Sequence, residues 1–381
     1  MKIYIVDITG KTPLYDASLV RSIHDLDGVD HQVVLLSPNP SYAEGNVWFR
    51  KLYMPLSRFF KKNSPLRKVC KGLESILNYL SVIRRVAFNR PDVIHFQWLP
   101  YTEKSSKMDI LFFSLLKSVH AKSKVFLTVH NLTPHNVTGA ALDSFMDIFK
   151  KVMRHIDGFI VHTSSTKDEF CSLFDVNPEK VSVVRHGIFD KGELPPRIDA
   201  DSSVCNVLMY GTQSFYKGTD ILVDSLTYLP ENVRQQLSVK IVGMTDQTFY
   251  NEHSDKAKAL GVEWRNALIS DEELKELLSW SDVIVLPYRK ISQSGVLLET
   301  IYYEKPIIIS DMPSFVETLS GYEQAMIFKA GDSEDLSQSL NNFVSGNLDM
   351  DLVFNVIKSK KAEYSWENSA KQTIFAYLYN C

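Results

Sequence analysis

The sequence predicts an α/β protein built from two doubly wound domains. With 381 residues, the chain exceeds what one ordinary hydrophobic core accommodates. Uniformly apolar, strand-like runs recur along it with helix-length segments between them. A stretch containing prolines and acids, residues 190–203, divides these runs into two series. An apolar content of 45% and an aromatic content of 11% are typical of folded globular proteins.

The first series of apolar runs predicts the sheet of an N-terminal domain. Its members are residues 2–8, 32–37, 92–98, 124–130, 158–163 and 181–187. Strands that are apolar throughout and alternate with helices indicate a parallel sheet covered on both faces.

The second series predicts a similar C-terminal domain. Its members are residues 206–211, 238–243, 282–288, 306–310 and 325–328. We therefore expect domains at 1–190 and 191–364, with 190–203 as the linker. The segment 365–381 contains a helix opened by a serine cap, which we expect to pack back on the first domain. Ligands of such sheets bind beyond the carboxyl ends of the strands, so a cleft between the two domains is the expected site.

Positive charge is concentrated in one segment, although the net charge is only −3. Residues 50–90 contain eleven Lys and Arg but a single acid, Glu74. The cations alternate with apolar residues, a pattern that suits an anionic membrane surface. We expect this contact from a group of four cations, Lys61, Lys62, Arg67 and Lys68. Nucleic acid is the competing partner, but no recognised nucleic-acid motif accompanies the patch, and a solvated helical face is the remaining alternative.

The cysteines and the N-terminus favour a cytoplasmic protein. Four cysteines are scattered without a C-x-x-C pair, so neither a disulfide framework nor a zinc site is indicated. The opening MKIYIVDITG reads as a strand, not as a signal peptide. No apolar run approaches the ~18 residues that span a bilayer.

Two segments of the second domain could hold phosphates. In TQSFYKG, after the strand that ends at Gly211, Lys217 would place a positive charge just before a helix. A glycine turn with a solvated lysine is the alternative. In SQSGVLLE, Ser294 and Gly295 offer a hydroxyl and open backbone N–H groups at a helix start. Glu299, one turn further on, could bind the vicinal hydroxyls of a ribose, unless it is an ordinary exposed residue behind a serine cap.

Histidines follow two strands of the first domain. His130 and His135 come directly after a strand in KVFLTVHNLTPHN, where an imidazole can contact a substrate. His95 lies near the end of another strand and is also a candidate, although a packed structural histidine is the alternative reading.

Taken in order, these motifs resemble the GT-B fold glycosyltransferases, specifically the large retaining family that includes bacterial polysaccharide mannosyl-, glucosyl- and galactosyltransferases. The resemblance covers most of the chain. It rests on TGKTPLYDASLVRSI, DVIHFQWLP, LTVHNLTPHN, VSVVRHGI, YGTQSFYKGTDILVDSL, WRNALISDEELKELLSWSDVIVLPY and SQSGVLLETIYYEKPIIISDMPSFVE. The order and spacing of the last three segments are its most specific part.

The resemblance implies roles for individual residues. Lys217 matches the lysine that contacts the donor diphosphate, and Glu299 matches the second glutamate of the Glu-x7-Glu motif, which holds the ribose. Ser294 and Gly295 fall where backbone amides meet the phosphates. Three further matches are the base-binding segment at Trp264 and Arg265, the phosphate-approaching Gly10, and the strand-end His130 near the donor sugar and acceptor.

The sequence departs from the family pattern at two positions. Ile291 stands where the first glutamate is expected, and Ser214 replaces an arginine three positions before the lysine. Gln293 could supply a neutral sugar contact in place of the glutamate. Arg265, Arg289 or Lys290 could offset the missing positive charge.

The resemblance implies a cytoplasmic enzyme, peripheral on the inner face of the membrane. It would transfer a sugar from a UDP- or GDP-linked donor to a lipid-linked acceptor during surface polysaccharide assembly, with retention and without metal or cofactor. Nucleic acid is not an expected partner. A sugar-nucleotide 2-epimerase and a non-catalytic subunit of an assembly complex are the alternatives. A dinucleotide-dependent dehydrogenase is disfavoured, because no G-x-G-x-x-G follows the first strand.

Overall fold

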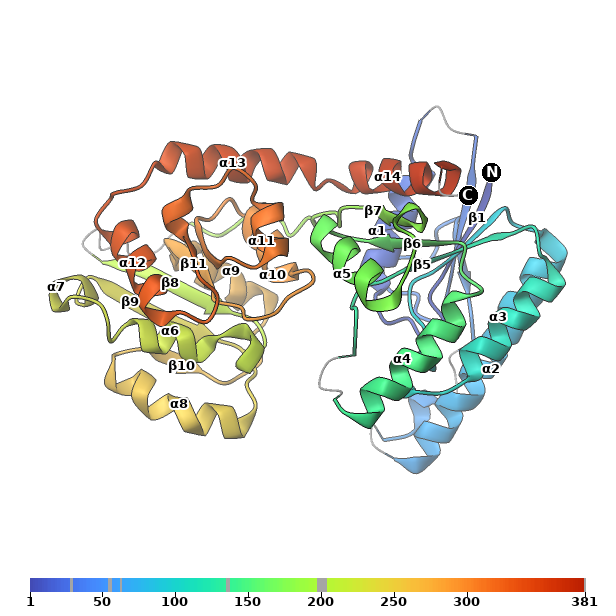
Figure 1. The fold of residues 1–381 in the computed structure, drawn as a ribbon, viewed down its shortest axis with the longest axis horizontal. Helices are drawn as coiled ribbons and strands as arrows, with labels where there is room; N and C mark the ends of the chain where they lie inside the picture. Colours follow the sequence, from blue (N-terminus) through green and yellow to red (C-terminus); the bar gives the residue numbers. More distant parts are fainter. Residues whose placement is uncertain (28–29, 54–56, 62–63, 135–137, 197–203, 380–381) are drawn as a thin grey trace. The chain divides into compact units, whose positions relative to one another are not determined.

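The computed structural model describes residues 1–27, 30–53, 57–61, 64–134, 138–196 and 204–379. The chain forms two compact units (Figure 1). One, the N-terminal unit, comprises Met1–Gly187 together with Trp366–Cys381, and the other, the C-terminal unit, comprises Ile188–Ser365. Each unit is described by itself.

The N-terminal unit is built on a parallel sheet with the order β3-β2-β1-β4-β5-β6-β7. The strands are β1 (Lys2–Val6), β2 (Gln32–Ser37), β3 (Phe49–Lys51), β4 (Val93–Phe96), β5 (Lys124–Thr128), β6 (Gly158–Val161) and β7 (Val181–Val183). The residues of β4 and β6 are all buried, because helices cover both faces of the sheet.

The helices of this unit are connections between the strands. They are α1 (Pro13–His24), α2 (Pro65–Asn89), α3 (Met108–Val119), α4 (Ala140–Met153) and α5 (Ser164–Phe174), with short 3-10 turns at Ser57–Phe59, Thr102–Lys104 and Pro178–Lys180. Helices α2 and α3 lie side by side (Figure 1). Ser64 caps α2 by accepting from the Arg67 backbone N–H.

The last helix, α14 (Trp366–Tyr379), belongs to the N-terminal unit and packs against α1 and β6. A Cβ atom on Gly187 would come within 2.3 Å of the Trp366 ring, so a glycine is required there. The Tyr377 hydroxyl lies 2.6 Å from Nδ1 of His95 in the sheet. These contacts explain why the C-terminal segment returns to the first unit, as the sequence predicts.

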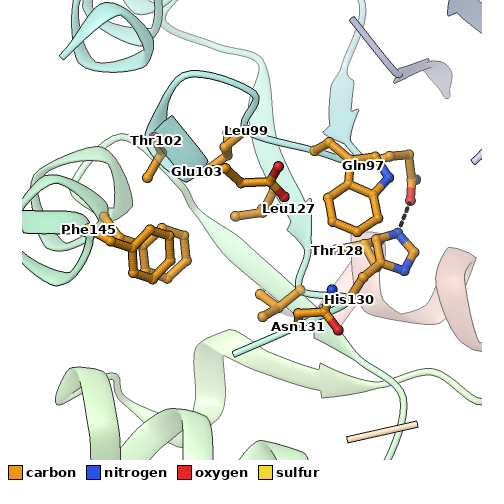
Figure 2. Close-up of a pocket in the computed structure, with 12 residues that line it drawn as sticks. Gln97, Leu99, Thr102, Glu103, Leu127, Thr128, His130, Asn131 and Phe145 are labelled. Carbon is orange, nitrogen blue, oxygen red and sulfur yellow. Dashed lines mark hydrogen bonds between the residues drawn. The ribbon is translucent and has the colours of Figure 1, made fainter. Parts of the chain in front are cut away.

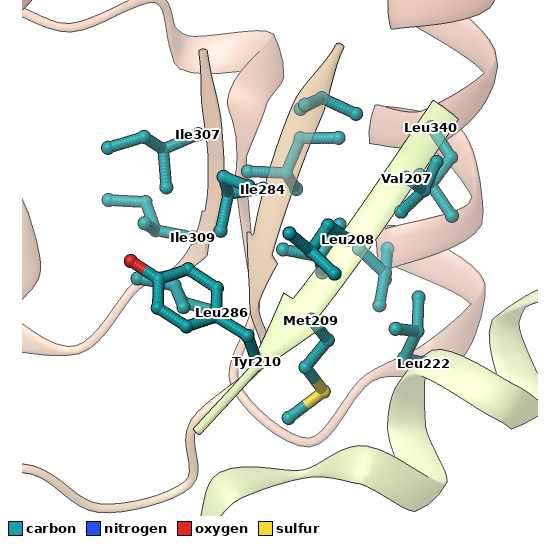
Figure 3. Packing of buried hydrophobic residues seen from close by; sticks show 14 of the residues in the cluster. Val207, Leu208, Met209, Tyr210, Leu222, Ile284, Leu286, Ile307, Ile309 and Leu340 are labelled. Atoms are coloured by element: carbon teal, nitrogen blue, oxygen red, sulfur yellow. The ribbon is translucent and has the colours of Figure 1, made fainter. Parts of the chain in front are cut away.

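The C-terminal unit has a second parallel sheet with the order β10-β9-β8-β11-β12-β13. Its strands are β8 (Cys205–Tyr210), β9 (Leu237–Val242), β10 (Glu263–Arg265), β11 (Val283–Leu286), β12 (Ile307–Ser310) and β13 (Ile327–Phe328). Its helices are α6 (Thr219–Ser225), α7 (Glu231–Arg234), α8 (Gln247–Ala259), α9 (Asp271–Trp280), α10 (Gly295–Tyr302), α11 (Pro313–Thr318), α12 (Ser333–Val344) and α13 (Met350–Glu363). Figure 3 shows Leu222 and Leu340 of the helices α6 and α12 packed against β8.

All expected strands are present, but two observed strands were not predicted. They are β3, which has the sequence FRK, and β10, which has the sequence EWR. Both lie at sheet edges, are short, and carry charged residues, so they lack the apolar run that identifies a buried strand. No helix in the described ranges is long and apolar enough to cross a membrane.

Candidate functional site

The turn after β8 brings Lys217 to the carboxyl edge of the C-terminal sheet. Gly211 has φ +95° and Gly218 has φ +72°, conformations that favour glycine. A Cβ atom on Gly218 would lie 1.9 Å from the Pro287 carbonyl oxygen, so the turn touches the end of β11. This close approach fixes the short 3-10 turn Phe215–Lys217 between the two strands.

Lys217 is a largely buried cation without a carboxylate partner in the described part of the chain. Its Nζ donates to the Tyr288 hydroxyl at 2.8 Å and lies 4.4 Å from the centroid of the Tyr288 ring. Burial lowers the pKa of Lys217 to about 8. The Lys217 ammonium is therefore partly removed from water, and the Tyr288 hydroxyl accepts its hydrogen bond among the described residues. A cation in this environment is stabilised when an anionic ligand binds beside it.

Helix α10 begins at the same sheet edge. The Ser294 side chain accepts from the Leu297 backbone N–H at 3.2 Å, so the serine cap expected as an alternative is present. Burial raises the pKa of Tyr288, the residue that contacts Lys217, and the Ser294 hydroxyl acts on this pKa in the opposite direction by lowering it. Gly295 is exposed, and a Cβ atom added there would meet no atom within 4 Å. Gly295 at the start of α10 therefore faces open space. The Ser294 hydroxyl occupies the Leu297 N–H, which leaves the N–H groups of the two preceding helix residues for an anion.

The alternative interpretation of Glu299 as an ordinary exposed helix residue does not agree with the structure. Its side chain is 16% exposed and forms an ion pair with Lys191, with 3.1 Å between Nζ and Oε1. Burial, and secondarily the charge of Glu299, raises the pKa of Tyr303 to about 12. The carboxylate is thus held in a half-buried environment that Lys191 stabilises.

The two positions that depart from the family pattern, Ile291 and Ser214, differ in what their side chains contact, as does the neighbouring Gln293. Ile291 packs against the hydrophobic core of the C-terminal unit, and its carbonyl accepts from the Ser314 hydroxyl at 3.2 Å. Gln293 is half-buried. The Ser214 hydroxyl is buried and has no hydrogen-bond partner among the described residues.

Arg289, one of the three cations suggested as a replacement for the missing arginine, is engaged by other groups of the C-terminal unit. Its guanidinium forms two hydrogen bonds with Asp220, at 2.8 and 2.6 Å, and a third with the Phe215 carbonyl. It therefore braces the turn that carries Lys217. Arg265 donates to Glu273 at 2.6 Å, whereas Lys290 is exposed and joins no ion pair in the described ranges.

Gly10 in the N-terminal unit is explained by packing. It has φ +65°, and a Cβ atom there would lie 2.6 Å from Cβ of Asn39. The neighbouring backbone N–H groups of Thr9, Gly10 and Lys11 donate to the buried Asp7 carboxylate at 2.6–3.0 Å. Because this carboxylate occupies them, those N–H groups are not open to a phosphate in the described conformation.

His130 lies at the end of β5, beside a small cavity of about 40 Å³ (Figure 2). Its ring stacks on Trp98 at 4.6 Å, and its Nε2 lies 3.2 Å from Oε1 of Gln97. With the Gln97 amide placed as it is, its oxygen accepts from Nε2 of His130 and leaves Nδ1 as an acceptor; the opposite amide orientation, which would give the buried and unpartnered Gln97 Nε2 a partner, reverses the two ring nitrogens. Burial, reinforced by His162, lowers the pKa of His130 well below its usual value. His130 is therefore a neutral imidazole at the carboxyl edge of the sheet.

His95 is a packed structural residue, which corrects its assignment as an acceptor contact. Its side chain is 0% exposed, and its two ring nitrogens lie 2.6 Å from the Tyr377 hydroxyl and 2.7 Å from the Thr128 hydroxyl. Burial lowers its pKa to about 3. His135, the other predicted contact, lies outside the described residues.

Helix α2 carries much of the predicted membrane-binding segment. Apolar side chains with helical spacing are exposed along it: Leu66, Val69, Leu73, Ile76, Leu77 and Leu80. Lys61 is exposed, whereas Arg67 is half-buried and donates to the Phe60 carbonyl. Lys62 lies outside the described residues, and the side chain of Lys68 is likewise not described.

Three residues of these sites were not singled out from the sequence. Lys191 lies in the apparent linker, and its pairing with Glu299 depends on tertiary contacts. Asp7 interrupts an apolar strand, an anomaly that could have marked it. Tyr288 ends the DVIVLPY run, where an aromatic residue fits both a core and a site. No group of three or more metal-ligating side chains occurs within the described ranges.

The family models agree with this architecture. Residues 18–190 match Glycosyltransferase Family 4, and residues 191–361 match Glycosyl transferases group 1. The chain therefore belongs to the glycosyltransferases, and its two Rossmann-like units have the GT-B fold.

Individual relatives are distant. An uncharacterized glycosyltransferase of Methanocaldococcus jannaschii is 24% identical over 57% of this chain and 59% of its own length. A GDP-mannose:glycolipid 4-beta-D-mannosyltransferase of Xanthomonas campestris is 24% identical over 59% of this chain and 63% of its own. The matched region thus spans about three fifths of these curated relatives. HepE of Anabaena, solved with UDP and glucose, superposes with a TM-score of 0.66 over 98% of both chains at 14% identity.

Proposed function

We propose that this protein transfers a sugar from a nucleoside-diphosphate sugar to an acceptor hydroxyl. The observation that carries the proposal is the grouping at the carboxyl edge of the C-terminal sheet. A half-buried ammonium, Lys217, donates to Tyr288, and the N-terminus of α10, with Gly295 exposed, precedes Glu299. Membership of the glycosyltransferase family supports the same assignment.

Each part of this grouping fits one part of the donor. The N–H groups at Gly295 and the ammonium of Lys217 would bind the diphosphate. The Glu299 carboxylate would accept from the ribose hydroxyls, after Lys191 shifts from its ion pair or joins the nucleotide site. Ile291 offers the transferred sugar only apolar contact, so Gln293 is the nearby polar group for it.

The proposed catalysis is electrostatic. As the bond from the sugar to the phosphate breaks, negative charge develops on the leaving diphosphate. Lys217 and the α10 N–H groups stabilise this charge more strongly than they stabilise the ground state. We assign retention of configuration and independence of metal on the family resemblance, with the leaving phosphate accepting the proton of the attacking hydroxyl. The neutral His130 would orient sugar or acceptor hydroxyls through Nδ1.

We further propose a lipid-linked acceptor and an anionic membrane surface as partners, in surface polysaccharide assembly. The exposed apolar stripe of α2 supports this, since the helix presents six apolar side chains to solvent within a segment rich in cations. The protein would then act at the inner face of the cytoplasmic membrane.

The donor site is tested by titrating UDP, GDP and their sugar conjugates by calorimetry. We expect one nucleotide class to bind, with affinity reduced by about tenfold or more in Glu299→Ala and little changed in the exposed Glu252→Ala. Nucleotide binding that is absent, or indifferent to Glu299, would reject the donor site. Nucleotide binding without sugar transfer or donor hydrolysis would favour the non-catalytic alternative.

Membrane binding is tested with vesicles of equimolar phosphatidylcholine and phosphatidylglycerol. Leu73→Gln with Leu77→Gln should weaken sedimentation with the vesicles, while Leu173→Gln on α5, also exposed in the same unit, should not. Replacing Lys61, Lys62 and Lys68 with Glu should lower binding about a hundredfold, because each cation contributes about 1 kcal/mol near the headgroups. Equal sedimentation of all variants would rule out this surface.

A further inference from the structure

The N-terminal unit contains a second, much larger cavity that the donor site does not use. Its volume is about 670 Å³, within the roughly 300–1,000 Å³ range of small-molecule sites. It lies between the first half of α2, the end of β1 and the connection from β4 to α3. We call it the α2 cavity and define it by Arg67, Lys71, Glu74, Asn78, Tyr101 and Lys104.

The cavity exists because only half of α2 packs on the sheet. Arg67, Lys71, Glu74 and Asn78 recur at intervals of three or four residues, so they share one face of the helix. Four residues further along this face, Val82 is buried in the core. The same face therefore contacts the core in the second half of α2 and lines the cavity with polar groups in the first.

Hydrogen bonds hold the walls of the cavity in place without a ligand. The Asn78 amide is buried; its Oδ1 accepts from the Tyr53 backbone N–H at 2.7 Å, and its Nδ2 donates to the Ile8 carbonyl at 3.2 Å. The Glu74 carboxylate accepts from the Ser57 backbone N–H at 2.6 Å. Two segments, the end of β1 and the connection from β3 to α2, are thus tied to α2, and the cavity is preorganised.

The cavity has an excess of positive charge. Arg67, Lys71 and Lys104 line it, and Glu74 is the acid that lines it with them. None of these three cations belongs to an ion pair in the part of the chain that the structure describes. By contrast Glu103, next to Lys104, pairs with Lys11 at 2.8 Å. A preformed, polar cavity with unpaired cations suits a multiply charged anion.

We propose that the α2 cavity binds a phosphate or diphosphate group of the acceptor. Arg67 can form paired hydrogen bonds with phosphate oxygens, and Lys71 and Lys104 add point charges. Glu74 and Ser75, which also line the cavity, suit the hydroxyls of an attached sugar. The proposal rests on the proposed function for its acceptor role. The phosphate comes either from a lipid diphosphate that carries the acceptor or from a soluble sugar phosphate.

The test is a calorimetric titration of the full chain with three probes: farnesyl diphosphate, inorganic diphosphate and glucose 6-phosphate. Lys71→Gln and Lys104→Gln remove single exposed cations, so the fold should persist. We expect each to weaken binding of the favoured probe by about tenfold, as for the loss of one charge-assisted hydrogen bond. Lys122→Gln is the matched control, because Lys122 is exposed at the opposite, amino-terminal edge of the sheet, just before β5.

The donor site also binds diphosphates, so each titration is repeated in a Lys217→Met background. Binding that persists in Lys217→Met and falls in Lys71→Gln supports the α2 cavity. Preference for farnesyl diphosphate over inorganic diphosphate assigns a lipid diphosphate, and preference for glucose 6-phosphate assigns a soluble sugar phosphate. Binding unchanged in both cavity variants, or reduced equally in Lys122→Gln, would overturn the proposal. If nucleotide binding still depends on Glu299 in that case, the proposed function stands without it.

Discussion

Lys217 should make nucleotide binding dependent on pH in a range where an ordinary lysine does not titrate. Burial lowers its pKa from 10.5 to about 8, so in the free protein the ammonium loses its proton near that pH. A bound diphosphate stabilises the charged form and raises the pKa again. At a pH between the pKa of Lys217 in the free protein and its higher pKa in the complex, Lys217 must take up a proton when the nucleotide binds. Each rise of one pH unit in this range therefore weakens binding tenfold.

The expected effect is large enough to measure. Between pH 7 and pH 9, a group with a pKa of about 8 passes from about nine-tenths to about one-tenth protonated, so nucleoside diphosphate affinity should fall about tenfold. The assay is calorimetric titration over this range, with Lys217→Met as the control for titration of the nucleotide itself. The variant should bind weakly and with little additional pH dependence.

The same burial predicts that Lys217 destabilises the protein without its ligand. A pKa lowered from 10.5 to about 8 corresponds to about 3 kcal/mol against the charged form. Because the folded pKa is the lower one, this cost is fully present below about pH 8 and disappears as the pH rises towards 10.5. Lys217→Met should therefore raise the urea midpoint at pH 7. Affinity that is constant from pH 7 to 9, or a variant less stable than the parent, would refute the reasoning.

Two further predictions concern stability. Gly218→Ala should cost several kcal/mol more than Gly261→Ala, because both glycines have positive φ but only the first would drive a Cβ atom against a backbone oxygen. For Gly261→Ala we expect about 1 kcal/mol, and equal urea midpoints for the two variants would contradict the packing argument. Burial also lowers the pKa of His162 to about 4 and those of His95 and His186 to about 3, so these histidines carry no stability cost above pH 6.5, whereas below it the unfolded chain binds protons that the folded state does not, and stability falls as the pH falls towards the folded pKa values. In urea titrations from pH 7 to 4, His95→Gln should reduce the pH slope of the unfolding free energy by up to about 1.4 kcal/mol per pH unit, and an unchanged slope would count against a buried neutral His95.

The sequence predicted the buried strands well because their signal is local. Runs such as 158–161 and 283–286 are apolar on both faces, as a strand covered on both sides requires. The edge strands β3 and β10 escaped prediction, since their pairing depends on a neighbouring strand and not on their own composition. The return of α14 to the first unit was predicted from its cap and its position, and the contacts of Trp366 and Tyr377 now explain it.

The sequence by itself determined the fold class, the family resemblance and the identity of the residues that follow each strand, because strand periodicity and motif spacing are properties of the chain. It could not distinguish a functional histidine from a packed one. His95 and His130 both occupy strand ends, but hydrogen bonds from β5 and α14 surround the first, whereas the second lies beside a cavity. Only tertiary structure decided that Arg289 braces a turn, that Lys191 pairs with Glu299, and that Arg67 and Lys71 line a cavity. Each of these depends on which segments meet in space, and burial and pairing then set the charge that a side chain can offer.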